Sequence, residues 1–97
     1  MIDSTRAYAK LVAAFNQNDW LRVQQRAAQL LPVAPDDAGV HFMLGVACLQ
    51  ARKIPGALTE LLKASQLDPL RADCIVEYAR ALTLSKRMRD ARFAADR

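Results

Sequence analysis

The strongest constraint on the fold is a regular period that runs through the sequence. Pro35 and Pro69 are 34 positions apart, and the large apolar residues Trp20, Ile54 and Met88 keep the same spacing. Further apolar sets with this spacing are Ala13, Ala47 and Ala81; Ala14, Cys48 and Leu82; Val23, Ala57 and Ala91; and Ala27, Leu61 and Ala95. A period of this length, with apolar positions in phase, is typical of antiparallel helix pairs stacked into a solenoid.

The composition agrees with an all-α chain. Of the 97 residues, 53% are hydrophobic and only three are Gly and four Pro, and β-branched residues are sparse. A chain of this length forms at most one small domain. Its apolar runs are shorter than the roughly 20 residues that a membrane span needs. The first ten residues lack the apolar segment of a signal peptide, so we expect a cytoplasmic protein.

Proline and acidic residues mark the expected helix boundaries. Pro55 suits the first turn of a helix, where its missing N–H does no harm, and Pro69 disfavours a helical conformation at Asp68 before it. Asp36 and Asp37 are adjacent acids at an expected helix start, where capping and the helix dipole favour them. The sequence therefore predicts six helices, near residues 4–16, 19–31, 38–51, 55–67, 72–84 and 88–97.

The middle repeat, residues 38–71, resembles a tetratricopeptide repeat (TPR). It has Leu44-Gly45 in its first helix, then Ala57 and Ala64 seven residues apart in its second, with a proline near its end. The resemblance implies a right-handed α-solenoid of stacked helix pairs in a single domain, residues 1–97. Its repeat units, called units 1, 2 and 3 below, are residues 4–37, 38–71 and 72–97. A complete third unit would run to residue 105, so we expect either a fragment of a longer protein or a partner that covers the open end.

Candidate catalytic groups are few. His41 is the single histidine, and it stands at a packing position of the repeat. Cys48 lies two helical turns from it, roughly 10 Å away, which is too far for a nucleophile and its base. Neither Cys48 nor Cys74 has a metal-ligand spacing around it, which favours free, buried thiols. We therefore expect no catalytic residue, no metal site and no cofactor, and the chain is not predicted to be an enzyme.

The net charge of +4 comes from the second half of the chain. The densest basic stretch contains Lys86, Arg87, Arg89, Arg92 and Arg97, with two acidic residues among them. A basic helix can contact phosphates, but interspersed acids are more typical of a solvated face. A nucleic-acid adaptor is therefore the least favoured of the functional hypotheses.

In the tetratricopeptide-repeat family, the first helix of each pair lines a concave groove that holds a peptide or a helix. By position, the resemblance implies a partner-binding groove made of Tyr8, Val12, Phe15, Phe42, Met43, Val46, Leu49, Val76 and Arg80. The apolar members suit the apolar face of a helix or the anchors of an extended peptide, and if exposed they would favour self-association. The alternative is that some of them, such as Val12 and Leu49, pack between the helices as ordinary core.

Some members of the family hold the acidic C-terminal tail of chaperones through a clamp of Lys, Asn and Arg side chains. By position, the clamp residues here are Tyr8, Val12, Met43, Asp73 and Glu77. None of these side chains carries a positive charge, and the two acids would repel a carboxylate. The sequence therefore predicts that such tails do not bind.

The favoured functional hypothesis is a protein–protein interaction module, a scaffold or adaptor, whose partner is another protein or a second copy of the chain. The alternative is the N-terminal repeat region of a larger bacterial enzyme, such as a glycosyltransferase or a sulfotransferase, by analogy of fold only. The length of the natural open reading frame would separate these two hypotheses. Salt-sensitive binding to DNA or RNA would favour the nucleic-acid adaptor instead.

Overall fold

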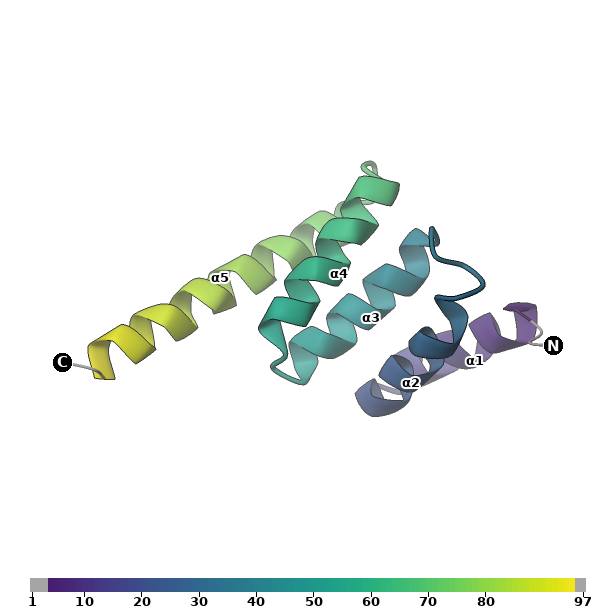
Figure 1. Cartoon of the computed structure of the whole chain (residues 1–97), viewed down its shortest axis with the longest axis horizontal. Helices are drawn as coiled ribbons and strands as arrows, with labels where there is room; N and C mark the ends of the chain where they lie inside the picture. The colour runs from purple at the N-terminus through teal and green to yellow at the C-terminus, as the bar shows by residue number, and fades with distance from the viewer. Residues whose placement is uncertain (1–3, 96–97) are drawn as a thin grey trace.

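The computed structural model describes residues 4–95 of the chain, and all regular structure within that range is α-helical (Figure 1). Five helices follow one another: α1 (Ser4–Asn16), α2 (Trp20–Leu30), α3 (Ala38–Gln50), α4 (Ile54–Leu67) and α5 (Ala72–Ala95). The molecule is elongated, with principal extents of 54 × 27 × 21 Å, as expected when helix pairs stack along one axis. No helix among residues 4–95 combines the length and the apolar composition that a bilayer span requires.

The helices form two layers. In Figure 1, α2 and α4 lie nearer the viewer than α1, α3 and the start of α5. Each helix packs on the next one along the chain, and α3 also contacts α5. α3 is therefore the central element, with neighbours on several sides, and it is buried at nearly every position from Gly39 to Leu49. This burial explains why α3 is apolar all round, whereas α2 presents its apolar side chains on one face.

The predicted boundary residues act as expected. The carboxylate of Asp37 caps α3 by accepting hydrogen bonds from the backbone N–H groups of Gly39 and Val40, at 2.9 and 3.2 Å. Pro55 stands in the first turn of α4, and α4 ends at Leu67, directly before Asp68-Pro69. These contacts confirm that short polar and proline signals set where helices begin and end.

The turns inside units 1 and 2 are the same turn, built twice. Asn18 and Arg52, which hold the same register position in the two units, have left-handed backbones with φ of 58° and 63°. The next residue in each turn donates its N–H back across the helix end: Asp19 to Ala14 O at 3.0 Å, and Lys53 to Cys48 O at 2.8 Å. This pattern is the Schellman motif, which ends a helix and reverses the chain.

The third unit has no such turn, so the prediction of six helices is wrong. The expected fifth and sixth helices, 72–84 and 88–97, are one continuous helix over residues 72–95. Lys86 holds the register position of Asn18 and Arg52 but lies inside α5. No Gly, Pro or Asn occurs between Leu84 and Ala95, so nothing there favours a left-handed residue over continued helix.

Candidate functional site

The nine side chains predicted to bind a partner all belong to α1, α3 and α5, and we call the surface of this layer the α1–α3–α5 face. Their exposure differs sharply between helices. Tyr8 and Val76 are exposed by 37% and 55%, and Arg80 is also exposed. The two other predicted residues of α1 are Val12 and Phe15, and both are half-buried. The four from α3, namely Phe42, Met43, Val46 and Leu49, are at most 9% exposed.

Phe42 is covered by residues from two other segments. The Phe42 ring lies 6.1 Å from the ring of Phe15, and the Arg71 guanidinium lies 5.0 Å above its centroid. Phe15 in turn meets Trp20 edge to face, at 5.6 Å between centroids. The structure thus brings Phe15 and Phe42 together across units 1 and 2. The α3 part of the predicted groove therefore belongs to the core, and only its α1 and α5 parts are partly or fully exposed. The role of the predicted groove in binding a partner stays a prediction.

Tyr8 and Arg71 converge at the end of the face where α3 begins. A Cβ added to Gly39 would lie 2.9 Å from Tyr8 Oη and 3.4 Å from Arg71 Nη1. The ends of two side chains from distant segments therefore meet over the backbone of Gly39. Arg71 is also held by the carboxylate of Asp73, with Nε at 3.1 Å from Oδ1. The result is a fixed aromatic and cationic edge to the α1–α3–α5 face.

A cleft of about 340 Å³ opens beside this edge. Its lining comes from α1, from the end of α2 and from the connection to α3: Thr5, Tyr8, Leu30, Ala34 and Asp37. Sequence reasoning missed this cleft, because it considered only the first helix of each pair as a binding surface. A signal that could have indicated it is the long connection between Leu30 and Ala38, which has seven residues against four in the equivalent connection between Leu67 and Ala72.

Two acidic residues of α5, Asp73 and Glu77, stand beside the arginines of this face. Glu77 pairs with Arg80 at 3.4 Å through Oε1, while its Oε2 is buried without a hydrogen-bond partner. Asp73 accepts from Arg71, as described above, and its side chain remains half exposed. At the clamp positions, therefore, Asp73 and Glu77 are carboxylates, whereas Tyr8, Val12 and Met43 supply no charge.

His41 is buried and hydrogen-bonded, as its packing position predicted. Its Nε2 lies 2.7 Å from the carbonyl oxygen of Pro35 and its Nδ1 lies 2.7 Å from Glu60 Oε2. A carbonyl only accepts, so Nε2 must donate to Pro35. The side chain, 9% exposed, ties the α2–α3 connection to α4. Both ring nitrogens therefore have partners within the fold.

Both thiols are free and buried, as predicted. Burial raises the pKa of the Cys48 thiol above its ordinary value, and the nearby Glu60 adds to the rise. Burial also raises the pKa of Cys74, with Asp73 as the next cause. Both groups are therefore protonated near neutral pH and are poor nucleophiles. Within the part of the chain that the structure describes, no three His, Cys, Asp or Glu side chains are grouped to hold a metal ion.

Comparison with known proteins shows the fold. No family model matches the sequence, and neither does any curated protein. Among solved structures, the chain resembles the TPR2B domain of yeast Sti1 in its complex with pHsp70. The two superpose with a TM-score of 0.79 over 91% of this chain and 70% of that one, at 22% sequence identity. The chain therefore has a tetratricopeptide-repeat-like fold, which confirms the interpretation drawn from the period of its sequence.

Proposed function

We propose that this chain is a protein–protein interaction module that holds a peptide or helix of another protein on its α1–α3–α5 face, and that it is not itself a catalyst. The observation that carries the proposal is the cleft of about 340 Å³ beside the exposed Tyr8. Ligand sites are typically concave and largely apolar, with a few fixed polar groups. The fold adds support, because the Sti1 domain that this chain resembles was solved in a complex with pHsp70.

The expected ligand has one large apolar side chain as its anchor. The Tyr8 ring and Ala34 offer apolar contacts in the cleft, and Asp37 and Thr5 stand among them. Leu30 also lines the cleft but is only 1% exposed. Beyond the cleft, Val76 gives a second apolar contact on α5. A segment that places apolar residues at both points would bridge the ends of the face, as helices and extended peptides do in other grooves.

A display experiment with random peptides tests this proposal while the partner is unidentified. A library of random dodecapeptides would be selected on the immobilised chain, and the enriched peptides measured by fluorescence anisotropy against variants. We expect the enriched sequences to share an apolar or aromatic anchor. Tyr8→Ser is expected to weaken their binding by about tenfold or more, the effect of losing roughly 1.4 kcal/mol of contact.

The matched control is Leu62→Ser, because Leu62 is exposed to a similar extent, 41% against 37% for Tyr8, but belongs to α4 in the other layer. It should leave the affinities unchanged. Peptides that lose affinity with Leu62→Ser and keep it with Tyr8→Ser would place the binding surface on the opposite layer. A selection that enriches no sequence would also contradict the proposal.

A further inference from the structure

α5 carries an exposed apolar surface that units 1 and 2 do not have. Ile75, Ala79 and Leu82 are spaced four and three residues apart, so they share one side of the helix. Ile75 is 53% and Leu82 is 47% exposed, and Ala79 is exposed as well. We call these three residues the α5 patch.

The same register positions are covered in unit 2. The counterparts of Ile75, Ala79 and Leu82 in that unit are His41, Gly45 and Cys48, and all three are buried. Each of the three faces α4: His41 contacts Glu60, a Cβ on Gly45 would lie 2.7 Å from Leu61 Cγ, and a Cβ on Gly56 would lie 3.6 Å from Cys48 Sγ.

In unit 1 the equivalent side chains are Ala7, Leu11 and Ala14. Leu11 and Ala14 are 0% and 2% exposed, and Ala7 is half-buried. The α5 patch is thus the third copy of one repeated surface. In units 1 and 2, the second helix of the pair (α2 or α4) helps to cover this surface.

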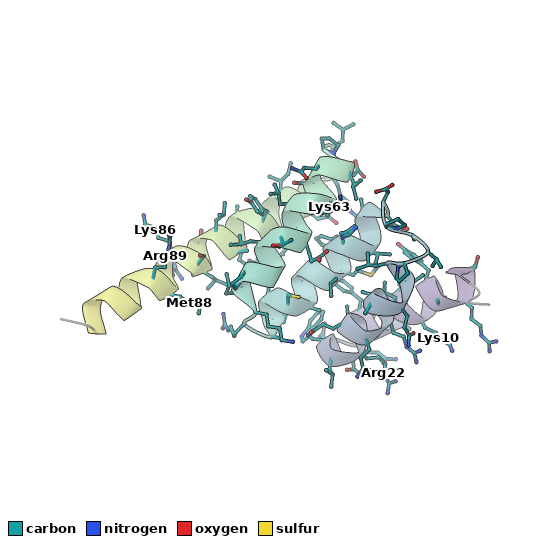
Figure 2. All side chains as sticks on the ribbon, viewed as in Figure 1. Lys10, Arg22, Lys63, Lys86, Met88 and Arg89 are labelled. Atoms are coloured by element: carbon teal, nitrogen blue, oxygen red, sulfur yellow. The ribbon has the colours of Figure 1, made fainter. Side chains whose placement is uncertain are left out.

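The segment that would cover the α5 patch is present in the chain but points away from it. By register, residues 88–95 are the second helix of unit 3, since Met88, Ala91 and Ala95 stand where Ile54, Ala57 and Leu61 stand in α4. Those three α4 residues are at most 3% exposed. Because α5 does not turn at Lys86, residues 88–95 run on past the N-terminal end of α4 (Figure 1). Figure 2 shows Lys86, Met88 and Arg89 on this continuing stretch of α5.

We propose that two copies of the chain exchange these segments, so that residues 88–95 of one copy cover the α5 patch of the other. The interface would repeat, between chains, the contact that α3 and α4 make within one chain. A straight α5 cannot reach its own patch, whereas the antiparallel α5 of a second copy presents the matching segment to it. The exchange is reciprocal, so that in a dimer with a two-fold axis both patches are covered at once.

The register also predicts which residues meet. Gly45 and Leu61 are in contact in unit 2, and their counterparts are Ala79 and Ala95. A small residue at position 79, like Gly45, allows two helix backbones to approach closely. A helix of an unrelated protein would not carry this register, which is why the second copy is the occupant that the repeat favours.

A disulfide trap tests the exchange. Ala79→Cys with Ala95→Cys places two thiols at the positions equivalent to the contacting pair in unit 2. After mild oxidation, we expect a covalent dimer on a non-reducing gel, and sedimentation should give twice the monomer mass of 10.8 kDa. The unmodified chain is the control, because its own Cys48 and Cys74 are buried. A cross-link formed only within one chain, or no cross-link at all, would overturn the proposal.

Two further variants separate the exchange from other forms of association. Ile75→Ser with Leu82→Ser should shift the protein to the monomer. Val76→Ser, at an equally exposed position on another side of α5, should leave the dimer intact.

A third variant, Lys86→Asn with Arg87→Asp and Arg89→Pro, copies the turn residues Asn18, Asp19 and Pro55 into unit 3. This variant should be monomeric and should convert the Ala79→Cys, Ala95→Cys cross-link from intermolecular to intramolecular. A dimer unaffected by the patch variant, or an unmodified chain that is monomeric at every concentration, would refute the exchange.

Discussion

Gly45 of α3 packs against the side chain of Leu61 of α4 so closely that a Cβ on Gly45 would lie 2.7 Å from Leu61 Cγ and 3.2 Å from the Leu61 backbone nitrogen. Leu61 is fully buried, and the contacted atoms include its Cγ and its backbone nitrogen, so the contact cannot be relieved by moving only the tip of a side chain. A helix-interior glycine costs about 1 kcal/mol relative to alanine. Gly45 therefore lowers the stability of α3 as a helix but allows α3 and α4 to pack more closely.

Gly45→Ala is expected to destabilise the fold in spite of its better helix propensity. Overpacking a close contact typically costs about 1–3 kcal/mol, which exceeds or cancels the propensity gain of about 1 kcal/mol. For a chain of this size, each kcal/mol corresponds to about 4–8 °C in the melting temperature. Thermal unfolding followed by circular dichroism should show a lower melting temperature than that of the unmodified chain.

Gly56→Ala is the matched control, since it makes the same chemical change within the adjoining helix. Its added Cβ would lie 3.6 Å from Cys48 Sγ, an ordinary van der Waals distance. The propensity gain of about 0.5–1 kcal/mol then remains, and the melting temperature should rise. If both variants shift the melting temperature in the same direction, close packing at Gly45 is not what decides its identity.

The two thiols give a prediction that depends on pH. Burial raises the pKa of Cys48 and of Cys74 above the ordinary value of 9.0, so the folded state favours the protonated thiols. Their contribution to the free energy of unfolding is complete below about pH 9 and is lost as the pH rises through the raised pKa values. We expect stability in urea titrations to fall above pH 9 for the unmodified chain, and to fall less for Cys48→Ala with Cys74→Ala.

Thiol labelling provides an independent readout of the same burial. At neutral pH, a disulfide reagent such as DTNB should react with the native chain far more slowly than with the chain unfolded in denaturant, where two thiols should be counted. Rapid native labelling of either cysteine would mean that its surroundings open readily and would contradict the buried position.

Phe42 and Val46 are expected to behave as core residues. They are 9% and 8% exposed, and truncation of a buried Phe typically costs about 3–5 kcal/mol. Phe42→Ser with Val46→Ser should therefore remove most of the cooperative melt in circular dichroism. Val76→Ser, an exposed position on the same face, should change the stability by less than about 0.5 kcal/mol. A double variant that keeps its melting temperature would show that these two residues are surface contacts after all.

The fold could be predicted because its signals are local and repeated. Helix boundaries are set by a few residues at a time. The structure has the expected boundaries at Asp37, at Pro55 and at Asp68-Pro69. The continuous α5 was not predicted, because register alone placed a turn at Lys86 where no residue favours one. Asn18 tolerates the left-handed backbone in unit 1, whereas in unit 2 the left-handed residue is Arg52 and the turn is followed by Pro55. Unit 3 has neither an Asn at this position nor a proline after it.

The candidate site was harder to predict, because exposure depends on residues distant in the sequence. Register correctly assigned Phe42 to the first-helix layer, but its burial is due to Phe15 in the preceding unit and Arg71 at the end of its own. Likewise, the cleft beside Tyr8 is completed by Leu30 and Ala34, which a pattern of first helices does not include. A periodic pattern gives the face of a helix, whereas the neighbouring units decide how much of that face is open.

Acidic chaperone tails are not expected to bind this chain. The Sti1 domain of similar fold was solved with pHsp70, so the pHsp70 ligand of that complex is the natural probe. Of the clamp positions of this chain, Met43 is only 6% exposed. Asp73 and Glu77 are carboxylates, and one oxygen of Glu77 is already buried without a hydrogen-bond partner. A carboxylate placed beside them gains no cation and meets like charge, which disfavours binding.

Isothermal titration of that ligand into this chain should give no saturable heat, while the Sti1 TPR2B domain in the same buffer serves as the positive control. Lower salt should not restore binding, because weaker screening strengthens the repulsion from Asp73 and Glu77 as well. Asp73→Asn tests the reason: it removes one negative charge without adding a cation, so we expect binding to stay undetectable. Saturable binding to the unmodified chain would mean that another cation, such as Arg71 or Arg80, replaces the clamp, and Arg71→Gln and Arg80→Gln would then identify which one.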